Sequence, residues 1–179
     1  MTLRPGRWAA RIEGPFVVFL IGARIHRLRD VRRWWPVFRA MPRMLAELRR
    51  STELGLLHTS TALEGPRSIV LTQYWRSFEQ LHAYARARDA AHLPAWAEYN
   101  RALRDNPAVG IWHETFLVPE GAYEAVYGDM PARGLGRAGT LVPAEGAARS
   151  ALGRLGRSAG NDLPLTDAGA AAEHDGSKG

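Results

Sequence analysis

Four short β-rich runs and the helical segments between them follow the order strand, helix, strand, strand, helix, strand, and this order constrains the fold more than any other feature. The first run, Pro15–Ile25, is rich in β-branched and aromatic residues and has the length of a buried central strand. Leu56–Leu63 and Arg67–Trp75 flank the turn-forming residues EGP and predict an antiparallel hairpin. Val109–Val118 is the fourth predicted strand.

Each helical segment carries its own local signal. Apolar residues between Val37 and Leu48 recur at helical spacing, although Pro42 lies inside the pattern and predicts a kink or two short helices. Ser77 stands three residues before Gln80, a capping box that begins a helix. Pro94 suits the first position of a further helix, which carries an apolar stripe and ends near Asn106.

This order is the split βαβ arrangement of a ferredoxin-like α+β fold. Helices then cover one face of the sheet only, so the other face needs a cover, and a homodimer that closes two sheets against each other supplies one. We expect an N-terminal arm over residues 1–14, the sheet domain with a C-terminal arm over 15–142, and an Ala/Gly/Arg-rich, largely disordered tail over 143–179.

The fourth strand carries two adjacent polar residues, His113 and Glu114. Because side chains alternate along a strand, Val109, Ile111 and His113 should point to one face, and Trp112 and Glu114 to the other. One of the two polar residues is therefore expected on the open face of the sheet.

Composition excludes several classes of site. The 179 residues include no cysteine, which rules out disulfides, thiolate metal sites, iron-sulfur clusters and cysteine nucleophiles, and fits a soluble cytoplasmic protein. The longest apolar run, Phe16–Ala23, is far shorter than the roughly 20 residues needed to span a bilayer. We therefore expect no membrane span.

The charge is uneven along the chain. The first 50 residues hold 12 arginines against Glu13, Asp30 and Glu47, and such a region can attract phosphates or anionic lipid. However, Lys178 is the only lysine, which indicates a compositional bias towards arginine. We expect no specific nucleic-acid partner.

Several stretches together resemble a known family. The stretches are FLIGARI, MLAEL, LGLL, QYWRSFEQLHAYARARDAAHLPAW, VGIWHETFLV and YEAVYGDMPARGLGRAG. In this order they are similar to a family of bacterial and fungal monooxygenase-like proteins, formerly a domain of unknown function, of the dimeric α/β-barrel superfamily. The resemblance covers roughly residues 18–139 and extends to the antibiotic-biosynthesis monooxygenase group. It implies a homodimer, a pocket between sheet and helices, and oxygenase activity on a small, largely apolar substrate.

Some monooxygenases of this superfamily need no cofactor, because a base deprotonates the substrate and the resulting anion reduces dioxygen. Such a site needs a base, hydrogen-bond donors and an apolar pocket. On chemical grounds we select His113 as the base, with His92 second and Glu114 as a further catalytic candidate. The predicted substrate-binding residues are Arg24, Gln73, Tyr74, Trp75, Trp96, Asn100 and Trp112.

Two alternatives stay open. Haem-dependent enzymes occur in the same superfamily, so His113 or His92 can instead be an axial haem ligand. The chain can also be a non-catalytic ligand-binding dimer, in which His113 is an interface histidine, Glu114 pairs with an arginine and the tryptophans fill the core.

Overall fold

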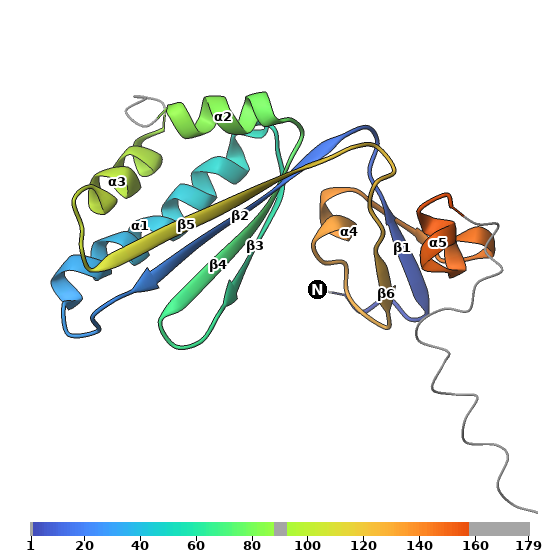
Figure 1. Cartoon of the computed structure of the whole chain (residues 1–179), viewed down its shortest axis with the longest axis horizontal. Coiled ribbons are helices and arrows are strands. Elements are labelled where there is room, and N and C mark those ends of the chain that lie inside the picture. The colour runs from blue at the N-terminus through green and yellow to red at the C-terminus, as the bar shows by residue number, and fades with distance from the viewer. Residues whose placement is uncertain (1, 88–92, 158–179) are drawn as a thin grey trace, which may run out of the picture. The chain divides into compact units, whose positions relative to one another are not determined.

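The computed structural model describes residues 2–87 and 93–157. The chain forms two compact units, which are considered separately below (Figure 1). We call Pro15–Val118 the sheet unit, and Met1–Gly14 together with Pro119–Gly179 the terminal unit.

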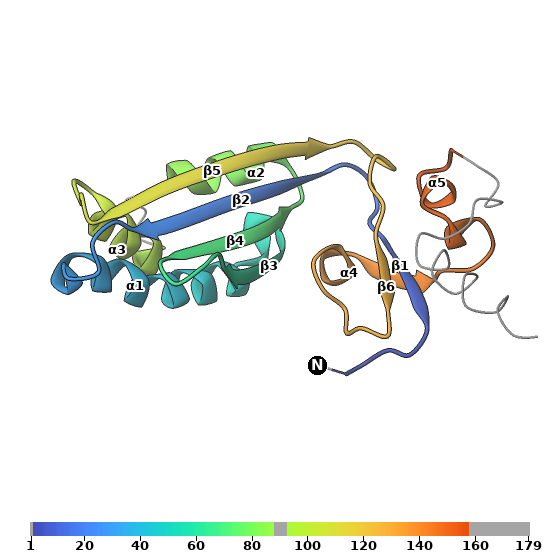
Figure 2. The same cartoon turned by 60° about the horizontal axis from the view of Figure 1, so that its bottom comes forward.

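The sheet unit has the predicted ferredoxin-like α+β topology. Its four strands are all antiparallel to their neighbours in the order β3-β4-β2-β5, and its helices lie on one face of the sheet (Figures 1 and 2). The predicted strands agree with the observed ones to within one residue at each end. In chain order the elements are β2 (Phe16–Ile25), α1 (Val31–Arg50), η1 (Thr52–Leu54), β3 (Leu56–Leu63), β4 (Ser68–Trp75), α2 (Phe78–Arg86), α3 (Pro94–Leu103) and β5 (Val109–Val118).

Strand pairing assigns every residue of the sheet to one of two faces. Ile21 pairs with Leu71 on one side and with His113 on the other, and the helices cover this row; we call this the helix face. The adjacent row, in which Leu20 pairs with Thr72 and Glu114, belongs to the opposite face, which we call the open face. The predicted alternation along β5 is confirmed, and Glu114 is the polar residue on the open face.

Helix α1 is longer than predicted, and the expectation of two short helices is wrong. It runs without interruption from Val31 to Arg50 with Pro36 and Pro42 inside it. A proline leaves the carbonyl four residues earlier without its helical hydrogen bond, but both prolines lie on the exposed side, where water can bond those carbonyls. Packing of the opposite side then keeps the helix whole, through the buried residues Val37, Ala40, Met41, Met44, Leu45 and Leu48.

Two hydrophobic clusters join the helices to the helix face. One joins α1 and α3 to β2, β4 and β5, and includes Met41, Leu71 and Tyr99. The other is centred on Trp75, which is fully buried, and includes Leu81 of α2. Burial of this apolar area is the main favourable term in the folding of the unit.

The two shorter helices begin with different caps. The predicted capping residue of α2 is confirmed, because Ser77 Oγ accepts a hydrogen bond from the backbone N–H of Gln80 at 3.3 Å. Helix α3 begins at Pro94, as predicted, but receives its cap from α1. The carboxylate of Glu47 accepts hydrogen bonds from the backbone N–H groups of Ala95 at 3.0 Å and Trp96 at 3.1 Å.

The terminal unit is a second antiparallel sheet, which the sequence did not predict. Its strands pair in the order β6-β1-β7. Tyr123 joins the two chain segments, because its hydroxyl accepts from the N–H of Ile12 at 2.7 Å and donates to the carbonyl of Ile12 at 3.0 Å. The elements are β1 (Arg7–Arg11), β6 (Val126–Gly128), α4 (Leu135–Ala138), β7 (Thr140–Pro143), η2 (Gly146–Arg149) and α5 (Ala151–Arg154).

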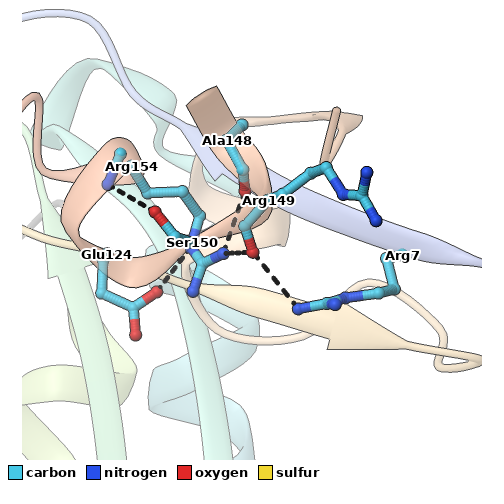
Figure 3. A network of polar contacts seen from close by, with 7 residues as sticks. Arg7, Glu124, Ala148, Arg149, Ser150 and Arg154 are labelled. Carbon is cyan, nitrogen blue, oxygen red and sulfur yellow. Dashed lines mark hydrogen bonds and ion pairs between the residues drawn. The ribbon is translucent and has the colours of Figure 1, made fainter. Parts of the chain in front are cut away.

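A buried arginine holds the last described turns of this unit in place (Figure 3). The Arg154 side chain, only 7% exposed, donates through Nε to Glu124 Oε2 at 2.8 Å. Its Nη1 donates to the carbonyls of Ala148 at 2.9 Å and Arg149 at 3.1 Å. Since a buried guanidinium is stable only when its donors are paired, this network fixes residues 146–154 as folded structure.

The chain therefore divides differently from the sequence-based expectation. The segments predicted as separate arms, 1–14 and 119–142, pair with each other because β1 supplies hydrogen-bonding edges to both β6 and β7. Part of the predicted tail, residues 144–157, carries η2 and α5. Residues 158–179 lie outside the described part of the chain.

The Glu47 cap gives a stability prediction. Replacing Glu47 with Ala should lower the free energy of unfolding by about 2 kcal/mol, because two charge-assisted hydrogen bonds to the start of α3 are lost. Glu47→Gln should cost less, since the amide oxygen can still accept one bond. Urea unfolding measures both changes. Glu53→Ala, at an exposed carboxylate on η1, is the matched control, and an equal loss in that variant would contradict the capping role.

Candidate functional site

A cavity of about 510 Å³ lies between the helix face and the helices of the sheet unit. The sheet side of its wall comes from β2, β4 and β5, and the helical side from α2 and α3, with Met44 from α1. Its volume falls within the range of pockets that hold small organic molecules. The expected pocket between sheet and helices is therefore present in the structure.

Gln73 supplies a hydrogen-bond donor of fixed orientation to this wall. Its side chain is 3% exposed and lines the cavity. The indole N–H of Trp75, which can only donate, bonds Gln73 Oε1 at 3.0 Å. The amide is thereby fixed, and its Nε2 donors have no acceptor among the described residues. Trp75 itself is buried behind the wall and acts by orienting Gln73.

Two buried tyrosines add neutral hydroxyl groups. Tyr84 is 5% exposed and Tyr99 is 2% exposed, and both line the cavity. Burial raises the pKa of Tyr99 to about 12. Burial also raises the pKa of Tyr84, and the negative charge of Glu47 adds to the effect. Both phenols therefore keep their protons throughout the neutral range.

The helical side of the wall is a continuous stack of aromatic rings. Tyr84 stacks on Trp96 with ring centroids 4.8 Å apart, and Trp96 stacks on Tyr99 at 5.8 Å. The hydroxyl of Tyr84 and the indole N–H of Trp96 are buried without a hydrogen-bond partner within the described residues. Buried donors left unpaired cost folding free energy, and both residues belong to the wall of the cavity.

His113 lies on the same wall, at the edge of the sheet. Its exposed imidazole packs on the ring of Phe19 with centroids 5.5 Å apart. No hydrogen bond restrains it within the described residues. Asn100 also lines the cavity, and its Nδ2 donates to the carbonyl of Trp96 at 2.9 Å, which leaves its Oδ1 as an acceptor.

The structure brings together some of the residues selected from the sequence and separates others. Gln73, Trp96, Asn100 and His113 all line the cavity. The two faces of the sheet explain the separation, because the other selected strand residues project from the open face. Arg24, Tyr74, Trp112 and Glu114 lie in the rows of the open face, and His92 lies outside the described residues.

The open face is a second surface of interest. Its edge strand exposes Trp112 at 38% and Phe116 at 50%. The indole of Trp112 lies against Gly22 so closely that a Cβ at that position would overlap the ring. A glycine in a central strand weakens it, so its presence here is explained by the close approach of this indole.

Sequence reasoning missed several wall residues, namely Phe19, His82, Tyr84, Tyr99, Arg104 and Thr115. A signal for Tyr84 exists, because it follows Leu81, a core residue of the same helix, by three positions. Tyr99 lies on the apolar stripe of α3, and that periodicity predicts a core position without indicating a role for its hydroxyl. Arg104 and Thr115 carry no local signal that separates a cavity wall from a surface.

Two further classes of site receive no support. Within residues 2–87 and 93–157, no three His, Asp or Glu side chains are grouped in a way that could bind a metal ion. In the same ranges, every helix is too short or too polar to cross a bilayer.

Comparison with known proteins gives one curated relative and several weak structural likenesses. Monooxygenase af470 of Aspergillus fumigatus is 31% identical over 84 residues, which cover 45% of this chain and 29% of that protein. The chain thus matches under a third of the length of this relative. SnoaB, a cofactor-independent oxygenase from Streptomyces nogalater, covers 56% of this chain and 90% of its own at 14% identity and a TM-score of 0.40. A dimeric ferredoxin-like protein from an uncultured marine organism covers 59% and 96% at 16% identity, also with a TM-score of 0.40.

The family assignment rests on a longer match. The family described as monooxygenase af470-like matches residues 16–135, which include every strand and helix of the sheet unit. This range is well over half of the chain. The resemblance found in the sequence is confirmed, and the chain belongs to the monooxygenase af470-like family.

Proposed function

We propose that the cavity is the active site of a cofactor-independent monooxygenase that oxidises an activated methylene group of a small, largely apolar substrate. The observation that carries the proposal is Gln73, a buried amide held by Trp75 so that its donors are free at the cavity wall. Membership of a monooxygenase family and the imidazole of His113 on the same wall support it.

The strand register sets the distance between the two polar groups. Gln73 pairs with Phe19, and His113 pairs with Ile21 two residues further along β2. Two strand spacings and a two-residue offset place their Cα atoms about 12 Å apart. Since the side chains of both residues project from the same face, a ring system fits between them.

The proposed reaction begins with proton removal. The imidazole of His113 takes a proton from a methylene carbon conjugated with a carbonyl or phenol oxygen. The negative charge that develops on this oxygen accepts a hydrogen bond from Gln73 Nε2, with Tyr99 as a second neutral donor. The stacked aromatic rings exclude water and hold a planar substrate.

Dioxygen then serves as the only oxidant. The carbanion adds to dioxygen, which forms a C–O bond, and protonation gives a hydroperoxide. Loss of water breaks the O–O bond and turns the methylene carbon into a carbonyl. The substrate carbon supplies all four electrons, one oxygen atom enters the product and the other leaves as water, so no external reductant is needed.

Turnover measurements test this assignment. We screen enolisable ketones and electron-rich phenols for oxygen consumption, and we expect a single atom of ¹⁸O from ¹⁸O₂ in the product. His113→Ala should lower kcat at least tenfold, and His26→Ala, which removes an imidazole outside the cavity wall, should not. Undiminished turnover in His113→Ala would exclude this residue as the base.

Gln73 permits a sharper test. Gln73→Glu keeps an oxygen that accepts from Trp75 but replaces the amide donor, so kcat should fall about 100-fold, and the buried carboxylate should also lower stability. Gln73→Leu should also leave the Trp75 indole unpaired and cost about 1–3 kcal/mol of stability. Unchanged kcat in Gln73→Glu would show that the amide does not stabilise a developing anion.

Haem is the second candidate, because two histidines, His82 and His113, line the cavity and either can supply an imidazole ligand. On the leading proposal, hemin added to the purified protein gives no Soret shift that depends on His113. A shift in the wild type that His113→Ala abolishes would instead establish a haem site.

We also infer that the open face is covered by a second copy of the chain. Helices shield only the other face, and the open face presents Trp112, Phe116 and the partly buried Val18 and Leu20 in adjoining rows. A second copy offers a face of the same shape and polarity, which is how symmetric dimers form.

Gly22 allows the dimer to be tested with a single methyl group. Gly22→Ala should push the Trp112 indole out of its position and weaken the dimer at least tenfold, while the monomer stays folded because the ring lies at the surface. Gly128→Ala is the control, since a Cβ there meets open space. Light scattering across a dilution series measures both, and a wild-type protein that is monomeric at micromolar concentration would contradict the inference.

A further inference from the structure

An exposed apolar patch lies where α1 begins, whereas most of the remaining exposed residues of this helix are arginines. Leu28, Val31 and Trp35 are 51%, 48% and 55% exposed. Val31 and Trp35 are one helical turn apart on α1, outside its buried stripe, and Leu28 lies in the loop just before the helix. We call these three exposed side chains the α1 patch.

Arginines flank this patch in the sequence. Between residues 27 and 50 there are eight arginines against Asp30 and Glu47, and two of the eight, Arg39 and Arg43, pair with Glu98 of α3 at 3.6 Å and 3.4 Å. The exposed arginines nearest the patch in the sequence are Arg27, Arg29, Arg32 and Arg33. None of these four forms an ion pair with any residue in the described ranges. Their charges are available to a partner.

Contacts of Trp34 fix the conformation of the patch. The indole N–H of Trp34 donates to the carbonyl of Leu28 at 3.1 Å, which fixes the loop before the helix. The Trp34 ring also makes edge contacts with Trp35 and Phe38, with centroids 5.9 Å and 5.7 Å apart. The apolar side chains are therefore presented without a rearrangement, and little conformational entropy is lost on docking.

We propose that the α1 patch docks the protein on the surface of an anionic lipid bilayer. Trp, Leu and Val side chains flanked by arginines match the two layers of a bilayer interface, because the apolar groups enter the acyl boundary while the guanidinium groups contact lipid phosphates. Two other partners fit less well. A nucleic acid gives no apolar site to Leu28 and Val31, and a second copy would bring two like-charged arginine clusters together.

Docking at this patch is independent of the chemistry in the cavity. The patch lies on the outer side of α1, and α1 covers the helix face, so the open face stays available to a second copy. The binding is peripheral and needs no spanning helix. It would place the cavity close to the medium in which apolar molecules concentrate.

Vesicle co-sedimentation of the full chain tests the proposal. Vesicles of phosphatidylglycerol and phosphatidylcholine should bind the protein, vesicles of phosphatidylcholine alone should not, and 0.5 M NaCl should release it. Tryptophan fluorescence should shift to the blue on binding, and Trp35→Phe should remove that shift. Equal binding to both kinds of vesicle, or binding to neither, would overturn the proposal.

Two double variants locate the surface. Arg29→Gln with Arg32→Gln should weaken binding about 25-fold, at about fivefold for each arginine. Arg49→Gln with Arg50→Gln makes the same charge change on α1, about 25 Å from Arg32 by helical rise and beyond the screening length, and should weaken binding much less. Equal losses in the two double variants would show unspecific charge attraction and reject the patch.

A nucleic-acid partner is distinguished by competition. Duplex DNA should displace the protein from vesicles only weakly, and Trp35→Ala should reduce vesicle binding at least fivefold without changing DNA binding. Tighter binding to DNA than to anionic vesicles, unaffected by Trp35→Ala, would assign the arginines to nucleic acid instead.

Discussion

The carboxylate of Glu47 positions helix α3, which forms part of the cavity wall. Pro94 can begin a helix but offers no side chain to bond the first free N–H groups of α3, and Glu47 bonds two of them from α1. Helix α3 is thereby positioned against α1, and with it the rings of Trp96 and Tyr99, which form the stack on the cavity wall. Burial raises the pKa of Tyr84, and the same negative charge adds to this effect.

Strand β5 has two chemically different sides, and on the proposed function each side has its own role. Ile111, His113 and Thr115 line the cavity, whereas Trp112 and Glu114 belong to the open face. Because β5 is the edge strand beside the central β2, both sides are poorly covered by the chain itself. A strand in this position can serve catalysis with one set of side chains and self-association with the other.

Much of the sheet unit was predictable because its signals are local and periodic. Alternation in Val109–Val118 placed His113 and Glu114 on opposite faces, and the capping residue Ser77 fixed the start of α2. The terminal unit was not predictable, because β6 is only three residues long and its pairing with β1 joins positions over 100 residues apart. The division of α1 into two helices was wrongly expected for a similar reason, since propensity is local but the packing that overrides it is tertiary.

The candidate site was predicted only in part, and the wall residues that were not predicted determine its chemistry. Sequence reasoning chose residues by the reactivity of single side chains, whereas the wall depends on neutral donors such as Tyr99 that become notable only when buried. The described wall residues include no Asp or Glu, and their one arginine, Arg104, is exposed, so the buried donors are uncharged. A buried cation would bind an anionic substrate and the anionic transition state about equally well, which does not accelerate the reaction. Neutral hydrogen-bond donors in an apolar cavity instead interact most strongly with the negative charge that develops during the reaction. On the proposed function, such a wall suits a substrate that enters neutral and loses its proton inside, because the imidazole of His113 lies on the same wall as the donors.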